Sequence, residues 1–400
     1  MRRADRPRVA RLALCQFLFI FASWLFVVYL PIYLRNELEP PMSPDRIGAL
    51  ISVYMFTTLL LILPLGYLSD RVSERRILQV GAGLFVVYAA LLLVVRSFWG
   101  LLAVQLTGGT GEAILLIVLP ALLYKKLGPV QRGRRVSGFI AAGLLGCAVA
   151  PYPCALLVEK AHLPYTTLFG ISFGASVLLF VAVSCLEETP PFAIRIADYL
   201  PDIRRREVLL VVIAICGLGI HAGQERTDLS LYFRNVAQFS LLELSLLFSL
   251  FGLWTAALTR LMGRLFDRNT HLLLLLGVGL ALSGGLHIAT AHVRTIGLVL
   301  GVRLLHTVGD VIVIFCYSVM VASIFPQQRL GGNSGFTYLF RATGAVVGAA
   351  VAGQLDKLFP SLQVSFAAAG GAMIVCGAVL LLNWRTLARV SRGMRVAVGN

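Results

Sequence analysis

The chain has 400 residues, of which 58% are hydrophobic and only 14% are charged. Soluble globular domains carry a much larger share of charged residues, so a water-soluble fold is excluded, as is intrinsic disorder, which requires low hydrophobicity. The chain is nevertheless basic, with 35 Lys and Arg against 19 Asp and Glu and a formal net charge of +16. In a soluble protein this charge would point to nucleic acid, whereas in a membrane protein its meaning depends on which loops carry it.

Twelve apolar segments are long enough to cross a bilayer as helices, which takes about 20 residues each. They are 12–34, 47–69, 77–95, 99–124, 136–158, 165–186, 208–233, 241–262, 271–291, 295–325, 331–353 and 361–384. The sequence therefore predicts an all-α membrane protein with twelve transmembrane helices. The longest polar interval, 187–206, holds two adjacent prolines and three adjacent arginines. It is predicted to be a linker between a six-helix half at 1–186 and another at 207–400.

The basic residues are distributed unevenly between the loops. Of the 35, 25 lie near the two termini or in the loops after the even-numbered spans, seven lie in the opposite loops, and three (Arg226, Arg303 and Arg341) lie at membrane depth. By the positive-inside rule both termini are predicted to be cytoplasmic, and no nucleic-acid partner is needed to explain the charge. The first apolar run is too long for a signal peptide. We therefore expect a multi-pass protein of the cell membrane, the inner membrane if the source is Gram-negative.

The two halves repeat each other at an offset of 197–199 residues. GYLSDR at 66–71 aligns with GRLFDR at 263–268, and YLRN at 33–36 aligns with YFRN at 232–235. In the fourth and tenth spans, Gln105 aligns with Arg303 and Glu112 aligns with Asp310. Parallel six-helix repeats of this kind place a substrate site near the middle of the membrane, between the halves.

The segment between the second and third spans resembles the signature of the major facilitator superfamily. The matching residues are Gly66, Leu68, Asp70, Arg71, Arg75 and Arg76, with a weaker copy at Gly263, Asp267 and Arg268. Ser73 and Glu74 depart from the signature, which usually has glycine and a base there. The resemblance covers essentially the whole chain. It implies the major facilitator fold and, more narrowly, a twelve-helix, proton-coupled exporter.

The signature residues are expected to form an inner gate. A carboxylate at a helix end can meet the positive end of a neighbouring helix, and the resemblance implies that Asp70 meets the eleventh span, which starts at 329–334. Gly66 would permit close helix approach. Arg71 would join Arg75, Arg134 and Arg135 in a charge cluster between the halves, with Gly263, Asp267 and Arg268 as the equivalent gate residues. The alternative is that the arginines only set topology.

Charges at membrane depth cost about 2.5–3.5 kcal/mol each, so each requires a reason. Arg303, His306 and Asp310 follow the spacing i, i+3, i+7 and share one helix face, and Glu112 is the counterpart of Asp310 in the first half. This array resembles the basic–His–acidic face of helix 10 in proton-coupled galactoside symporters of the superfamily. These four residues are predicted to couple transport to protons. The alternative is a static salt bridge of Arg303 with Asp310 or Glu112.

A second charged group, Gln224 to Asp228, lies in the seventh span. Either the helix unwinds there, or Glu225 and Arg226 pair with each other; Arg341 is a candidate counter-ion for Glu225 or Asp228. The residues predicted to line the substrate cavity are Gln105, Glu225, Arg226, Asp228 and Arg341.

The sequence thus predicts a secondary active transporter that exports a small organic solute in exchange for protons by alternating access. Proton-coupled uptake of a sugar-like or organic-acid solute and uncoupled uniport remain alternatives, because residues do not fix direction. A phosphate-binding loop and the HExxH and GxSxG motifs are missing, so the chain is not expected to be an ATP-driven pump or an enzyme. We expect no cofactor or metal, and a monomer whose partners are the solute, protons and the lipid bilayer.

Overall fold

The computed structural model describes residues 5–127, 132–188, 192, 195–268, 270–359 and 361–399. The described residues form helices and no strand. In chain order the helices are α1 (Asp5–Asn36), α2 (Pro44–Arg71), α3 (Glu74–Val94), α4 (Phe98–Lys126), α5 (Arg132–Val149), α6 (Pro151–Glu159), α7 (Thr166–Ser184), η1 (Ile196–Tyr199), α8 (Leu200–Ile203), α9 (Arg206–Leu231), η2 (Tyr232–Val236), α10 (Leu241–Arg268), η3 (Thr270–Leu275), α11 (Leu276–Thr290), α12 (Ile296–Ile324), η4 (Gln327–Arg329), α13 (Leu330–Leu358), α14 (Gln363–Leu382) and α15 (Trp384–Gly399).

Within the described residues, twelve helical segments are long and apolar enough to cross a membrane, which confirms the predicted all-α membrane fold. The fifth of them, Arg132–Glu159, consists of two helices, α5 and α6. They meet at Pro151, which has no backbone N–H to continue the helical hydrogen bonding. The described part of the chain also exposes large apolar side chains such as Trp99 and Leu382, as expected for a surface that contacts lipid.

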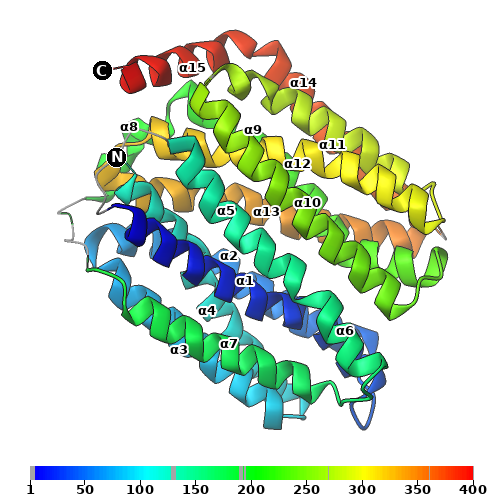
Figure 1. Ribbon diagram of the computed structural model, residues 1–400. Coiled ribbons are helices and arrows are strands. Elements are labelled where there is room, and N and C mark those ends of the chain that lie inside the picture. Colours follow the sequence, from blue (N-terminus) through cyan, green and yellow to red (C-terminus); the bar gives the residue numbers. More distant parts are fainter. Residues whose placement is uncertain are drawn as a thin grey trace.

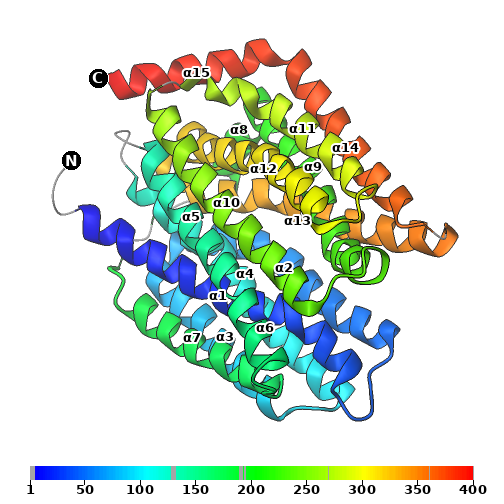
Figure 2. The same cartoon turned by 45° about the vertical axis from the view of Figure 1, so that its right-hand side comes forward.

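The helices lie side by side in a bundle, and both ends of the chain lie at the same end of it, here called the termini end (Figure 1). Helices α1 to α7, the N-terminal group, pack on one another, as do α9 to α14, the C-terminal group. The two groups meet where α2 packs against α13 and α5 packs against α10 (Figures 1 and 2). Spans α4, α9 and α12 are the most enclosed, so polar residues on them are placed in the interior.

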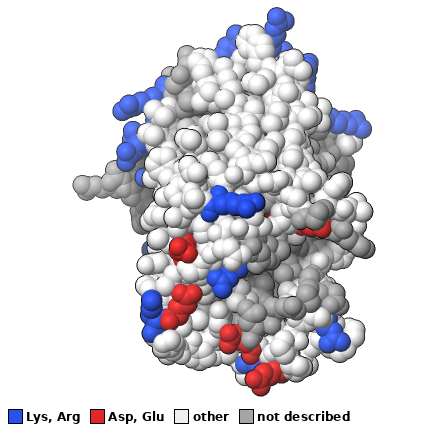
Figure 3. Space-filling model, turned by 90° about the vertical axis from the view of Figure 1, so that its right-hand side faces the viewer, with Lys and Arg blue, Asp and Glu red and all other residues white. Residues whose placement is uncertain are grey.

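Two further features lie at the termini end. The predicted linker 187–206 contains η1 and α8; its residues 189–191, 193 and 194 lie outside the described part. The last helix, α15, which the sequence pattern did not predict, packs against η3. Leu387 is buried while Arg385 and Arg389 are exposed, so α15 is amphipathic. Among the described residues, the opposite end of the bundle carries scattered acidic and basic side chains with no large patch of one sign (Figure 3).

Candidate functional site: a buried histidine and carboxylate cluster with two helix-end clamps

Helix α12 presents a line of polar side chains to the interior of the C-terminal group. Arg303 and His306 are buried, and His306 Nε2 lies 3.2 Å from Asp310 Oδ2, one turn along the helix. The shared face predicted from the spacing of these residues is therefore present. The Ser283 hydroxyl, on α11, also donates to Asp310 Oδ1 at 2.6 Å.

The partner of Arg303 comes from α9. Arg303 Nη1 lies 2.5 Å from Glu225 Oε1, so the predicted pairing of Arg303 with Asp310 or Glu112 is wrong. Both predictions for the seventh span are also wrong, because α9 is continuous through this region and Glu225 does not pair with Arg226. Arg226 is exposed and makes no hydrogen bond or ion pair with the described residues. Consecutive positions on a helix point in different directions, which separates Glu225 from Arg226.

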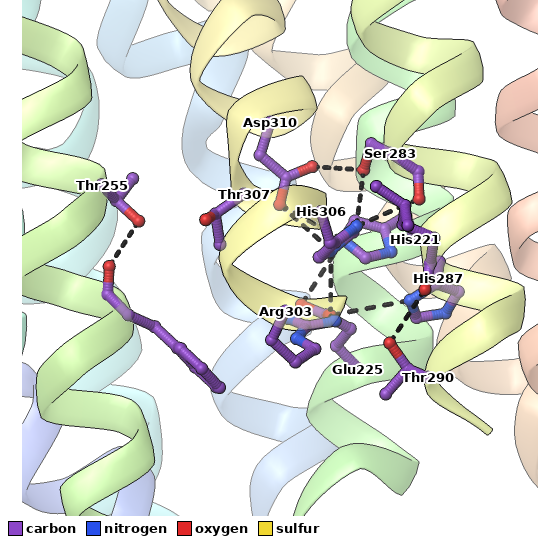
Figure 4. A network of polar contacts seen from close by, with 12 residues as sticks. His221, Glu225, Thr255, Ser283, His287, Thr290, Arg303, His306, Thr307 and Asp310 are labelled. Carbon is purple, nitrogen blue, oxygen red and sulfur yellow. Dashed lines mark hydrogen bonds and ion pairs between the residues drawn. The ribbon is translucent and has the colours of Figure 1, made fainter. Parts of the chain in front are cut away.

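Two histidines that the sequence analysis missed complete the cluster. His221 on α9 and His287 on α11 are buried, with ring centroids 4.4 Å apart, and His221 lies 4.8 Å from His306. Figure 4 shows the three rings and Glu225 directed toward one another from three helices. A signal was available: His221, His287 and His306 lie well inside apolar spans, where ionisable residues are rare and usually functional.

A second layer of hydrogen bonds orients this cluster. Gln224 Nε2 donates to Asp228 Oδ2 at 2.9 Å, and the Ser365 hydroxyl donates to the same oxygen at 2.5 Å. The other end of the Gln224 amide faces His287 Nε2 at 2.8 Å. Arg341, predicted as counter-ion to Glu225 or Asp228, pairs with neither; it donates to the Tyr338 hydroxyl on its own helix at 2.7 Å.

The N-terminal group has a smaller counterpart on α4. Glu112 is buried and accepts a hydrogen bond from the Tyr54 hydroxyl on α2. Gln105 is also buried, and its Oε1 has no hydrogen-bond partner among the described residues. The equivalent positions Glu112 and Asp310 thus both lie in the interior of their groups, while Gln105 and Arg303 differ in charge.

At the termini end, Asp70 joins α2 to the start of α13. The N–H groups of Gly331 and Gly332 donate to its carboxylate at 2.9 and 2.7 Å, which confirms the expected contact with the eleventh span. The Tyr199 hydroxyl donates to it at 2.7 Å, and Lys125 Nζ lies 2.7 Å away. Asp70 is completely buried, and these four donors satisfy it.

Asp267 repeats this arrangement in the other direction. The N–H groups of Gly133 and Arg134, at the start of α5, donate to its carboxylate at 2.8 and 3.1 Å. The Arg134 side chain lies 3.6 Å from the same carboxylate, with half of its surface exposed. Gly263, one turn before Asp267, packs against Gly133, while Arg268 is exposed.

The linker strengthens the contact around Asp70. Asp202 on α8 accepts two hydrogen bonds from Arg329, at 2.7 and 3.0 Å, and one from Asn333 at 2.9 Å. Burial raises the pKa of Asp202, but these hydrogen bonds outweigh it and leave the pKa below its ordinary value. Burial, with the charge of Asp70 and the hydrogen bond to it, raises the pKa of Tyr199.

A family model described as Major Facilitator Superfamily matches residues 12–349. The chain belongs to this superfamily. It is therefore a membrane transporter and not an enzyme.

Known facilitators resemble the chain to different extents. The probable sugar efflux transporter of Helicobacter acinonychis (strain Sheeba) is 25% identical over 262 residues, which are 63% of this chain and 66% of that protein, just under two thirds of its length. The crystal structure of the human organic anion transporter MFSD10 (TETRAN) matches with a TM-score of 0.79 at 19% identity, covering 94% of this chain and 99% of that one. A bacterial homologue of the iron transporter ferroportin in the outward-facing state gives 0.72 at 14% identity, with the same coverage. These structures show the shared fold alone.

The departure of this facilitator from the family signature has a structural reason. Glu74, which replaces the usual base, is buried and lies 2.6 Å from Lys125 Nζ. Lys125 thus pairs with Glu74 as well as Asp70, and it also donates to the Ser69 carbonyl at 2.8 Å. The role of Lys125 was not predicted, because basic residues in the loops follow from membrane topology alone.

Arg71 does not join the predicted charge cluster in this facilitator. Its guanidinium donates to the Tyr67 hydroxyl of the same helix at 2.8 Å and is exposed. Of the four arginines predicted for that cluster, Arg134 pairs with Asp267, and Arg75 Nε is buried with no hydrogen-bond partner among the described residues. Buried Lys125, not Arg71, supplies the positive charge beside Asp70.

One group of side chains in the described residues has the composition of a metal site. It comprises His221, Glu225, His287 and His306, whose ligand atoms all lie within 4.8 Å of one another. Imidazole and carboxylate groups bind zinc and similar ions. The same groups can also hold and pass a proton.

Proposed function

We propose that this facilitator exports a small organic solute across the cell membrane in exchange for protons. Segments 1–186 and 207–400 would act as two halves that alternate around the linker 187–206, with both termini in the cytoplasm, as the distribution of basic residues favours. The named relative is a probable sugar efflux transporter, which makes a sugar-like solute the first candidate.

The observation that carries proton coupling is the pairing of Arg303 with Glu225 beside His306 and Asp310. Two partly buried carboxylates face one buried guanidinium, so with neutral imidazoles the cluster has one excess negative charge. Unbalanced buried charge costs several kcal/mol per ion. One proton on an imidazole removes the imbalance, and its release to the other side of the membrane would restore it. Glu112, with Tyr54, is the corresponding acid in the N-terminal half.

The solute would lie between the halves, near the groups predicted from sequence: Gln105, Glu225, Arg226, Asp228 and Arg341. Arg226 and Arg341 have no acidic partner among the described residues, and Glu112 and Glu225 are held by Tyr54 and Arg303. One proton moving through 100 mV supplies about 2.3 kcal/mol, enough to drive a moderate solute gradient. Proton-coupled uptake of a sugar-like or organic-acid solute, or uncoupled uniport, would use the same cycle.

Proteoliposomes containing a pH-sensitive dye test this proposal. Added sugars or small organic acids should cause a pH change with the wild-type protein, and Glu112→Gln or Asp310→Asn should reduce it at least tenfold. Glu243→Gln is the control, because Glu243 is exposed and the amide can still accept the backbone hydrogen bond from Ser240. Solute movement without any pH change would contradict proton coupling and indicate uniport. Equal rates in all three variants would contradict the assigned residues.

A further inference from the structure

The three buried histidines converge on Glu225 from three different helices. His306 Nε2 lies 3.5 Å and His287 Nδ1 lies 3.7 Å from Glu225 Oε1, and His221 Nε2 lies 3.4 Å from Oε2. His287 and His306 are fully buried. The nitrogens facing Glu225 from these two rings have no hydrogen-bond partner among the described residues.

The hydrogen bonds behind His287 determine which of its nitrogens is protonated. The Gln224 amide turns its Nε2 toward Asp228 and donates to Oδ2 of that side chain at 2.9 Å. The Gln224 oxygen then faces His287 Nε2 at 2.8 Å and requires a proton there. In the neutral ring, His287 Nδ1 is left with a lone pair directed toward Glu225.

His306 is held in the same way from its other side. Its Nδ1 lies 3.0 Å from the Ser283 backbone carbonyl oxygen, which can only accept. In the neutral ring, Nε2 therefore has the lone pair, and it faces both Glu225 and Asp310. Lone pairs directed at carboxylate oxygens repel them unless a cation lies between. A proton can lie between one imidazole nitrogen and one carboxylate oxygen, whereas a metal ion can bind several of these nitrogens and the carboxylate at once.

We propose that His221, His287, His306 and Glu225 form a binding site for a divalent first-row transition-metal ion, with Zn²⁺ as the reference ion. Three imidazoles and one carboxylate are borderline ligands of the kind that zinc binds in four-coordinate sites. Ligating histidines usually donate their other ring N–H to an oxygen acceptor, as His287 does to Gln224 and His306 does to Ser283.

The charges at the site favour a cation. Glu225 and Asp310 carry two negative charges beside the one positive charge of Arg303, so with neutral imidazoles the group has an excess of negative charge. Arg303 fixes the carboxylate of Glu225 at 2.5 Å. All four ligands lie in the C-terminal group, so binding does not require the two groups to approach. The proposal goes beyond the transport cycle and does not depend on it, although the ion and a transferable proton would exclude each other.

The test uses the full chain, purified with a histidine-free affinity tag in nanodiscs. Calorimetry with Zn²⁺ should give one ion per chain, and Co²⁺ should give the visible absorption of a four-coordinate site. His287→Gln and His306→Gln should each weaken binding at least tenfold, while His292→Gln, which changes an exposed histidine, should leave it unchanged.

A second variant separates the site from misfolding and from adventitious binding. Gln224→Met removes no ligand but frees His287 Nε2, and loss of such an outer contact should weaken the ion 10–100-fold. The melting temperature and gel-filtration profile without metal establish that each variant is folded. Equal affinity in folded His287→Gln and wild type, or no Zn²⁺ binding by the wild type, would overturn the proposal. If the wild type binds no Zn²⁺ but shows substrate-dependent proton flux, only the metal site is refuted. If it binds Zn²⁺ but shows no proton flux, only the proposed proton coupling is refuted.

Discussion

Asp70 and Asp267 each accept hydrogen bonds from two successive backbone N–H groups at the start of a helix in the opposite group. Asp70, in the N-terminal group, binds the first turn of α13, and Asp267, in the C-terminal group, binds the first turn of α5. The internal repeat therefore produces two reciprocal clamps at the termini end. A carboxylate at a helix N-terminus contributes about 0.3–2 kcal/mol. The clamps are unequal, because Asp70 is completely buried and also pairs with Lys125.

Asp70→Asn should impair the clamp more than Asp267→Asn. The new amide keeps one acceptor oxygen but carries no charge, so Glu74 becomes the one carboxylate that pairs with Lys125 among the described residues. Because Lys125 keeps Glu74 as a counter-ion, the expected loss is that of hydrogen bonds to a charged group, about 1.5–3 kcal/mol, whereas Asp267 pairs with the half-exposed Arg134 and should lose about 1 kcal/mol. Spin labels at the exposed positions 11, on α1, and 385, on α15, should show a larger population with the termini end open in Asp70→Asn.

Arg71→Gln is the control for this comparison. Arg71 is adjacent to Asp70 in sequence but contacts Tyr67 of its own helix. In Arg71→Gln, the distribution of distances between the two spin labels should match that of the wild type. A larger shift in Arg71→Gln than in Asp70→Asn would show that the signature arginine, and not the carboxylate, holds the groups together.

Tyr199→Phe should loosen the linker without changing the pH response of the clamp between pH 6 and 9. The hydroxyl donates to Asp70, and hydrogen bonds to charged groups contribute about 1.5–3 kcal/mol. The raised pKa of Tyr199 keeps the hydroxyl protonated in this window, so its contribution is lost only as pH rises above the ordinary tyrosine value of 10.0 toward the folded-state pKa. Trypsin cleavage of the arginine-rich linker, followed against pH, measures the effect.

Asp202 should give the opposite pH dependence. Its lowered pKa means that its contribution is present above the ordinary value of 3.8 and is lost as pH falls through the folded-state pKa. Asp202→Asn should therefore increase cleavage at neutral pH to the level that the wild type reaches only in acid. Cleavage of Asp202→Asn at the wild-type rate would show that the bond to Arg329 does not anchor the linker.

The twelve spans could be predicted because each needs only a sufficient run of apolar residues. Features that depend on contacts with neighbouring helices were harder to predict from the sequence. The sequence left open that α9 unwinds at 224–228, yet Glu225 and Asp228 have partners on other helices, and the helix is continuous there. α15 was missed because its apolar residues form only one stripe and its composition resembles a basic tail.

The candidate site was also predictable only where its residues lie on one helix. The spacing of Arg303, His306 and Asp310 on a single helix correctly predicted their shared face. The partners His221 and His287 come from α9 and α11, and no local pattern specifies which faces of those helices meet α12. Arg341 and Glu225 were paired by charge alone, whereas packing places Arg341 beside Tyr338.

Gly66→Ala should separate α2 from α13. A Cβ at Gly66 would lie 2.8 Å from the Gly331 carbonyl oxygen and 3.2 Å from the Gly335 Cα, both backbone atoms that cannot rotate away. Overpacking of this kind costs about 1–3 kcal/mol. Gly170→Ala is the matched control, since a Cβ there meets nothing within 4 Å. Melting temperatures in detergent should fall for Gly66→Ala only; equal values would mean that α2 and α13 tolerate a wider spacing.

Arg303 and Glu225 should behave as a coupled pair in a double-mutant cycle. Arg303→Gln leaves the partly buried Glu225 carboxylate without its nearest cation, which should cost at most about 3–5 kcal/mol in the free energy of unfolding, the range for fully buried pairs. Adding Glu225→Gln removes that unpaired charge and should restore most of the loss. Arg226→Gln, at the exposed position next to Glu225, should change stability by less than about 0.5 kcal/mol. Reversible unfolding in mixed micelles gives all four corners of the cycle. A coupling energy below about 0.5 kcal/mol, the additivity expected of independent sites, would show that the histidines and Asp310 balance Glu225 without Arg303.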